Sequence, residues 1–118
     1  MSVTGIGGVF FRAEDPSALK AWYHKYLGLS FDFKAPWVQE AGQTLFMPFS
    51  KGTDHFPADK QFMINFRVTD LDGLLAKLRE AGIGITTNPD WDTPKTGRFA
   101  HIHDPEGNRI ELWEPPAE

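Results

Sequence analysis

Residues 104–114 read Asp-Pro-Glu-Gly-Asn-Arg-Ile-Glu-Leu-Trp-Glu, a turn followed at once by an alternating segment. The first five residues favour turns, because proline fixes φ, glycine permits positive φ, and Asp and Asn side chains bond to nearby backbone. Residues 99–103 and 109–114, on either side of the turn, alternate as strand residues do. The stretch therefore predicts a β-hairpin whose loop is 104–108.

The position of this loop fixes the pairing between the two strands of the hairpin. His103 then lies opposite Arg109, and His101 lies opposite Glu111. Directly opposed residues are about 4.5–5.5 Å apart at Cβ, so His101 and Glu111 are close enough to touch. The face of the hairpin that holds them is predicted to carry Phe99, His101, His103, Arg109, Glu111 and Trp113.

Two amphipathic helices are predicted earlier in the chain. The first is expected between Asp15, which caps the helix, and Gly28, which suits a left-handed end. The second is expected between Asp70 and Gly82 for the same reasons. Both contain leucine at helical spacing, so each helix is expected to bury one face.

Each helix follows a strand-like segment, and these two strand–helix units resemble each other. Phe11-Arg12-x-x-Asp15 in the first unit recurs as Phe66-Arg67-x-x-Asp70 in the second. The recurrence favours one supersecondary unit used twice over two unrelated units with similar caps.

The remaining alternating segments complete an α+β chain of one domain. Strands are expected at 6–12, 29–33, 36–40 and 44–49 in the first half, and at 62–68, 83–87, 99–103 and 109–114 in the second. The order is β-α-β-β-β twice, with module one at about 1–50, a connector at about 50–61 and module two at about 62–118. In the strand at 62–68, Met63, Asn65 and Arg67 share a face that is expected to line a concavity or meet solvent.

Composition excludes several functional classes. The 118 residues include no cysteine, which excludes disulfides, thiolate metal sites and a cysteine nucleophile. The net charge of −4 argues against nucleic acid as a partner. No apolar run approaches the roughly 20 residues that span a bilayer, and the first residues lack a signal-peptide pattern. We therefore expect a cytoplasmic protein with neither nucleic-acid nor membrane partners.

The chain resembles the vicinal oxygen chelate superfamily, which includes glyoxalase I, bleomycin-resistance proteins, fosfomycin-resistance enzymes and extradiol dioxygenases. The resemblance rests on Gly-Ile-Gly-Gly-Val-Phe-Phe-Arg at 5–12, on Tyr-Leu-Gly-Leu at 26–29 and on the hairpin stretch at 104–114. Together with the duplicated plan, these motifs cover essentially the whole chain. The resemblance implies two tandem modules forming a half-open curved sheet, and a homodimer with its cleft at or near the subunit interface.

Metal-dependent members of this superfamily hold an ion with four residues from the first and last strands of the modules. Carried over to this chain, the four positions fall on Gly8, Met63, Glu111 and either Thr44 or Phe46. Glycine and a thioether do not replace imidazole as ligands for Zn or Ni. The resemblance, with these departures, implies that the usual site is lost and that no metal cofactor is bound. The alternative is a relocated site in which Glu111 acts with His101 or His103.

Five side chains are predicted to contact the ligand through polar groups. Glu111 is expected to act as a polar anchor or general base, with His101 tuning it, unless it is merely an acid held by a neighbouring cation. Arg12 falls where glutathione-dependent relatives hold a substrate carboxylate, and its repeat partner Arg67 offers the same guanidinium fork. Both arginines are alternatively ion-pairing residues at the rim. Asn65 is a candidate for orienting a carbonyl group.

Aromatic residues are abundant, and a few of them are expected to line a ligand cleft while most form core. The predicted lining residues are Phe10, Phe99, His103 and Trp113, with Trp91 as a further candidate. His55, in the connector, is either a lid residue or an exposed loop histidine.

The sequence thus favours a protein that binds a small anionic or aromatic organic molecule in an aromatic-lined cleft. It would sequester that molecule or perform metal-independent acid–base chemistry. Two alternatives stay open: a metal-dependent lyase, isomerase or dioxygenase of the glyoxalase type, and a non-catalytic interaction module.

Overall fold

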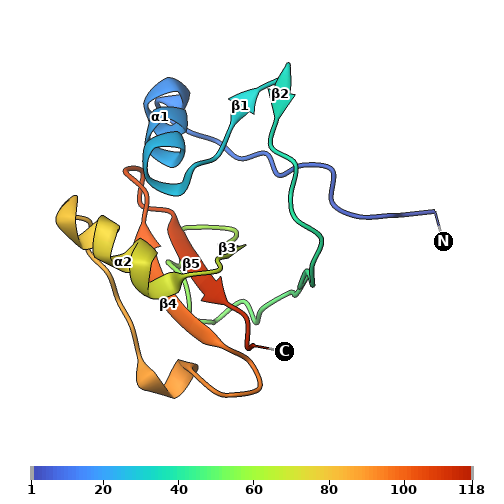
Figure 1. Ribbon diagram of the computed structural model, residues 1–118. Helices are drawn as coiled ribbons and strands as arrows, with labels where there is room; N and C mark the ends of the chain where they lie inside the picture. Colours follow the sequence, from blue (N-terminus) through green and yellow to red (C-terminus); the bar gives the residue numbers. More distant parts are fainter. Residues whose placement is uncertain (1, 118) are drawn as a thin grey trace.

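The computed structural model describes residues 2–117. It contains two α-helices, each with a capping residue at its N-terminus (Figure 1). α1 (Pro16–Leu27) begins where the Asp15 carboxylate accepts a 3.1 Å bond from the Ala18 N–H, and it ends at Gly28, with φ +73°. α2 (Leu71–Glu80) is capped in the same way by Asp70. Both predicted helices are confirmed, because their start and stop signals are local to the chain.

The second half of the chain forms a three-stranded sheet of β3 (Ile64–Arg67), β4 (Arg98–His103) and β5 (Arg109–Glu114), in the order β3-β5-β4. β4 and β5 are antiparallel, and their register pairs His101 with Glu111 as predicted. β3 lies parallel to β5, which places Asn65 beside Glu111 and Arg67 beside Trp113. The predicted polar and aromatic face of this sheet is therefore confirmed.

The opposite face of the sheet forms the core. Its apolar side chains pack against both helices, and Ala100, Ile102, Ile110 and Leu112 are at most 1% exposed. The helices contribute Leu19, Tyr23, Leu71, Leu75 and Leu78. Because side chains alternate along a strand, one face of the sheet is buried under the helices and the other holds the polar side chains.

The loop of the hairpin is held by one buried carboxylate. Asp104 is 4% exposed and accepts hydrogen bonds from the Tyr23 hydroxyl (2.7 Å), the Asn108 side chain (2.7 Å) and two backbone N–H groups within the loop. Burial, together with the hydrogen bond to Asp104 and its negative charge, raises the pKa of Tyr23 far above its usual range. Tyr23 therefore remains a hydrogen-bond donor, and it fastens the hairpin loop to α1.

The first half of the chain differs from the prediction in its strands. The expected strands at 29–33 and 36–40 reduce to β1 (Phe31–Asp32) and β2 (Ala35–Pro36), and 6–12 and 44–49 are not in strands. The expected strand at 83–87 makes a single bridge, from Thr86 to His101. Figure 1 shows the first-half segments extending away from the three-stranded sheet. Strands need a neighbour to bond with, and within the part of the chain that the structure describes segments 6–12 and 44–49 have no strand partner.

The fold class is nevertheless the predicted one, a mixed α+β arrangement of helices and sheets. The division into two modules joined by a connector stays a prediction. In the part of the chain that the structure describes, no helix has the length and apolar character to cross a membrane.

Candidate functional site

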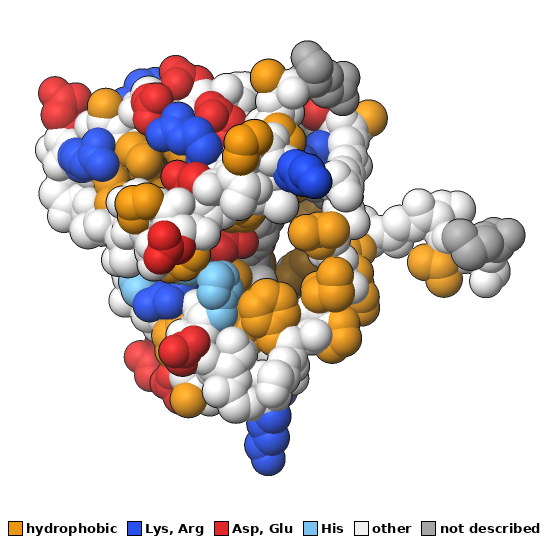
Figure 2. Space-filling view, turned by 90° about the horizontal axis from the view of Figure 1, so that it is seen from below, with side chains coloured by type: hydrophobic (Ala, Val, Ile, Leu, Met, Phe, Trp, Pro, Cys, Tyr) orange, Lys and Arg blue, Asp and Glu red, His pale blue; other side chains and the backbone are white. Residues whose placement is uncertain are grey.

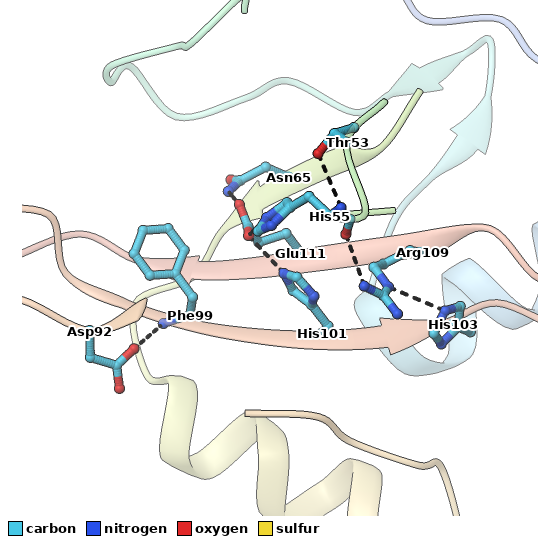
Figure 3. Close-up of polar contacts among 9 residues, drawn as sticks. All are labelled: Thr53, His55, Asn65, Asp92, Phe99, His101, His103, Arg109 and Glu111. Carbon is cyan, nitrogen blue, oxygen red and sulfur yellow. Dashed lines mark hydrogen bonds and ion pairs between the residues drawn. The ribbon is translucent and has the colours of Figure 1, made fainter. Parts of the chain in front are cut away.

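Glu111 lies at the centre of a cluster of polar side chains on the open face of the sheet (Figure 3). The Asn65 side-chain amide donates to its Oε1 at 2.8 Å. His101 and His55 both direct Nε2 at its Oε2, at 2.8 and 3.1 Å. β5, β3, β4 and the connector each supply one member, so the cluster joins four separate parts of the chain.

Burial and hydrogen bonding act on Glu111 in opposite directions. Burial disfavours the carboxylate and alone would raise the pKa of Glu111. Hydrogen bonds from His101, Asn65 and His55 favour the carboxylate, and together they hold the pKa below its usual value of 4.5. Glu111 is therefore ionised at neutral pH, which makes it an acceptor for a ligand N–H or O–H group, or an anionic ligand for a cation.

His101 is held rigidly in this cluster. Its side chain is fully buried, and its ring stacks on Trp91 with centroids 4.3 Å apart and planes 29° apart. Trp91 comes from the short 3-10 helix η1 (Pro89–Trp91), whose first residue follows an Asn88 cap. The Nδ1 atom of His101 is buried and has no hydrogen-bond partner among residues 2–117. All the polar contact of this imidazole is thus made through Nε2, towards Glu111.

The backbone of His55 is held by two hydrogen bonds, one from its N–H and one to its carbonyl. Its N–H donates to the Thr53 hydroxyl at 3.1 Å, and its carbonyl accepts from the Arg109 guanidinium at 2.9 Å. Its ring lies 5.0 Å from that of His101, edge to face, and 5.6 Å from that of Phe49. The imidazole is half-buried, so His55 belongs to the cluster and is not a free loop histidine.

The structure brings most of the other predicted residues to the same face. Phe99 and Trp113 stack with ring planes 11° apart and centroids 6.3 Å apart. Trp113 is anchored by its indole N–H, which donates to the Thr96 carbonyl at 2.7 Å. His103, at the end of the face, is exposed and contacts Arg109 at 3.4 Å rather than Glu111.

The predicted residues of the first strand are not in the cluster. Phe10 is 95% exposed and Arg12 is also exposed, both in the extended segment before α1. Arg67 donates to the carbonyl of Glu40 at 3.1 Å, away from Glu111. Phe10 and Arg12 stay outside the cluster because the segment that carries them forms no strand on the sheet, whereas Arg67 lies on β3 and is turned towards Glu40.

His55 and Trp91 were candidates from the sequence, but no contact between either of them and Glu111 was predicted. His55 lies 56 positions from Glu111 in an irregular connector, where no periodicity indicates which way a side chain points. The only local pattern near His55 is the pair of turn-forming residues before it, Thr53 and Asp54, which predicts a turn. A turn does not indicate which strand the connector will lie against.

The donor atoms available at the superfamily's metal positions are poor. Gly8 has no side chain, Met63 offers only a thioether, and neither Thr44 nor Phe46 is a carboxylate. Glu111 alone has the required chemistry. The side chains present therefore do not fit a four-ligand site at those positions.

The open face is not closed over Glu111. The structure has a small cavity of about 10 Å³ beside Tyr23 and a shallow depression of about 350 Å³ beside Arg67 and Lys77, and Glu111 lines neither. Figure 2 shows a hollow on one side of the molecule, with histidine along one border and hydrophobic side chains along the other. Within the cluster, the side chain of His55 is 30% exposed and that of Glu111 is 12% exposed, whereas that of His101 is fully buried.

These features define a class of protein: a glyoxalase-type α+β scaffold with a polar cluster on its open sheet face. Residues 5–112 match the Glyoxalase/Bleomycin resistance protein/Dioxygenase superfamily, and the chain belongs to that superfamily.

Individual relatives are more distant. The chain is 32% identical over 56 residues to the uncharacterized protein YraH of Bacillus subtilis (strain 168), a match that covers 48% of this chain and 44% of that protein. It therefore spans less than half the length of this relative.

Two solved structures from Streptomyces sp. CB03234 are also similar. One is TnmS3, an antibiotic binding protein, which is 24% identical and superposes with a TM-score of 0.60 over 98% of both chains. The other is a glyoxalase/bleomycin resistance protein, 33% identical over 46% of both chains, with a TM-score of 0.35. The first likeness supports the fold.

Proposed function

We propose that this protein binds a small aromatic organic molecule on the sheet face around Glu111, without the superfamily's usual four-ligand metal site. The observation that carries the proposal is the convergence of three side chains on one ionised carboxylate beside stacked aromatic rings. Glu111 accepts a hydrogen bond from the ligand, and His101 holds the carboxylate in place. An anionic group on the ligand would need a cation, and Arg67, whose guanidinium donates to the Glu40 carbonyl, would have to turn towards Glu111 to supply it.

The superfamily as a whole supports a small molecule as the partner, and one structural neighbour is named as an antibiotic binding protein. Planar aromatic antibiotics are therefore suitable first probes. Their rings match that of Phe99, which stacks on the 9% exposed Trp113, since offset-stacked aromatic pairs contribute about 0.5–1.5 kcal/mol beyond area burial. Sequestration and metal-independent acid–base chemistry by Glu111 and His101 are both compatible with this cluster. A cytoplasmic location stays a prediction from the sequence.

A ligand screen by melting temperature tests the proposal. We expect at least one planar aromatic antibiotic to raise the melting temperature, because a ligand at 100 times its Kd stabilises by about 2.7 kcal/mol. Phe99→Ala and Glu111→Gln should each weaken its binding at least tenfold by calorimetry. Phe33→Ala removes an exposed ring from the β1–β2 turn and should have no effect. Binding that survives both site variants would contradict the proposal, as would a screen without stabilisation.

We propose further that two copies of the chain associate through the first half. The accessible surface is 9238 Å², whereas a compact monomer of 13.3 kDa exposes about 6,450 Å² by surface scaling. The radius of gyration is 14.9 Å, against about 13.5 Å for a compact chain of this length. Exposed large hydrophobic residues include Val9, Phe10, Phe46 and Met47, in segments predicted to be strands. A second copy is the occupant that supplies matching extended segments, and interfaces of 2,000 Å² or more are common in obligate dimers.

Light scattering after size exclusion checks this association. We expect a mass of twice 13.3 kDa at micromolar concentration. Phe10→Asp combined with Phe46→Asp should give a monomer, because a charge in each predicted strand would be buried in the dimer. Phe33→Asp, at a fully exposed position in the β1–β2 turn, is the matched control. A monomeric wild-type protein would rule out the association.

A further inference from the structure

We propose that His55, His101 and Glu111 form a site for one divalent transition-metal ion, with Zn²⁺ as the reference ion. The set differs from the superfamily's metal positions in two of its three members and shares only Glu111. It also differs from the sequence prediction, in which His103 was one of the two candidate histidines. The inference goes beyond the proposed function. An ion bound here would be ligated by Glu111 and His101, so metal-independent chemistry by these two residues would apply only to the ion-free protein.

The three donor atoms lie close together. The Nε2 atoms of His55 and His101 lie 3.1 and 2.8 Å from the same oxygen of Glu111, and all three donors lie within 4.8 Å of one another. A tetrahedral zinc ion with bonds of 2.0–2.2 Å holds its ligand atoms about 3.4 Å apart. The separations of the donor atoms therefore lie near the value that such an ion needs.

The chemistry of the donor set suits such an ion. Two imidazoles and one carboxylate are the protein ligands of several catalytic zinc sites, and the same set binds non-haem iron(II). Three protein ligands leave a coordination position open. The side chain of Glu111 is 12% exposed and that of His55 is 30% exposed, so an ion and a further ligand can reach the site from solvent.

The surroundings hold these donors in position. Asn65 donates to the second oxygen of Glu111, as outer-shell residues do for ligating carboxylates. Trp91 fixes the plane of the His101 ring, and Arg109 holds the backbone of His55. His55 and His101 are therefore both held in place beside Glu111.

The unpartnered Nδ1 atom of His101 is expected to limit the affinity for the metal ion. Coordination through Nε2 leaves the His101 proton on Nδ1, which is buried and has no acceptor among the described residues. Losing an outer-shell partner of this kind typically costs 10–100-fold in metal affinity. We therefore expect binding weaker by that factor than at a site with a complete outer shell.

Titration of the chelator-treated, full-length protein with Zn²⁺ alone tests the site. Calorimetry should show close to one zinc ion per chain, and Co²⁺ should give visible absorption bands typical of a site with fewer than six ligands. His55→Ala should weaken zinc binding at least tenfold, and because His55 is in a half-buried loop this variant should keep the fold. Glu111→Gln should abolish binding.

His103→Ala is the matched control. It removes an exposed histidine from the same strand as His101, and it should leave zinc affinity and the cobalt spectrum unchanged. The assignment is overturned if neither ion binds at concentrations up to about 100-fold the protein concentration. It is also overturned if His55→Ala binds zinc as the wild type does, or if His103→Ala weakens binding as much as His55→Ala. Because the probe is an ion without any organic ligand, a failure here is distinct from a failure of the antibiotic screen.

Discussion

Replacing Asp104 with alanine is expected to lower the free energy of unfolding by about 3 kcal/mol. The substitution leaves the Tyr23 hydroxyl and the loop N–H groups of Glu106 and Asn108 without their acceptor. A buried donor that loses its partner costs about 1–3 kcal/mol, and the tyrosine hydroxyl is the most deeply placed of these groups. The loss should be measured by urea denaturation.

Two further variants show whether the loss of stability comes from the buried hydrogen bonds of Asp104 or from removing any turn carboxylate. Tyr23→Phe removes one bond and leaves Asp104 with its other donors, so we expect a loss of about 1 kcal/mol. Asp32→Ala removes a carboxylate that accepts from the Lys34 N–H in an exposed turn, and should cost less than about 0.5 kcal/mol. If Asp104→Ala were no more destabilising than Asp32→Ala, the hairpin loop would not be anchored as described.

Gly97→Ala is the second substitution with a large expected effect, a loss of about 3–5 kcal/mol. Gly97 has φ +97°, a conformation that L side chains rarely adopt. A methyl group there would lie against the Glu114 carbonyl oxygen, and within 3.0 Å of the Trp113 indole nitrogen and 3.1 Å of the Pro115 Cα. Because two of these contacts are with backbone, the end of β5 would have to shift, and the Thr93–Gly97 pairing at the start of β4 would be lost.

Gly107→Ala is the matched control for this effect. Gly107 also has positive φ, at +81°, but a methyl group there would meet nothing within 4 Å. We expect only the conformational cost of about 1–2 kcal/mol. Thermal or denaturant unfolding of both variants gives the comparison. Equal losses at the two positions would show that the close approach at Gly97 contributes nothing.

Sequence reasoning was most accurate where the determining interactions are local. The cap residues Asp15 and Asp70 and the loop at 104–108 each act on backbone within four residues. The hairpin register followed from that loop, and with it the contact between His101 and Glu111. The interpretation was wrong in placing strands at 6–12 and 44–49 within one chain, because alternation indicates a capacity to pair but not the presence of a neighbour.

The amino-acid sequence by itself determined the α+β class, the two helices and the face of the hairpin that carries Glu111. Only the tertiary structure decided that His55 and Trp91 join that face, and that Phe10 and Arg12 stay away from it. The physical reason is the range of the interactions. Caps, turns and alternation are set by neighbours along the chain, whereas the path of a connector over a sheet depends on the packing of residues that are distant in sequence.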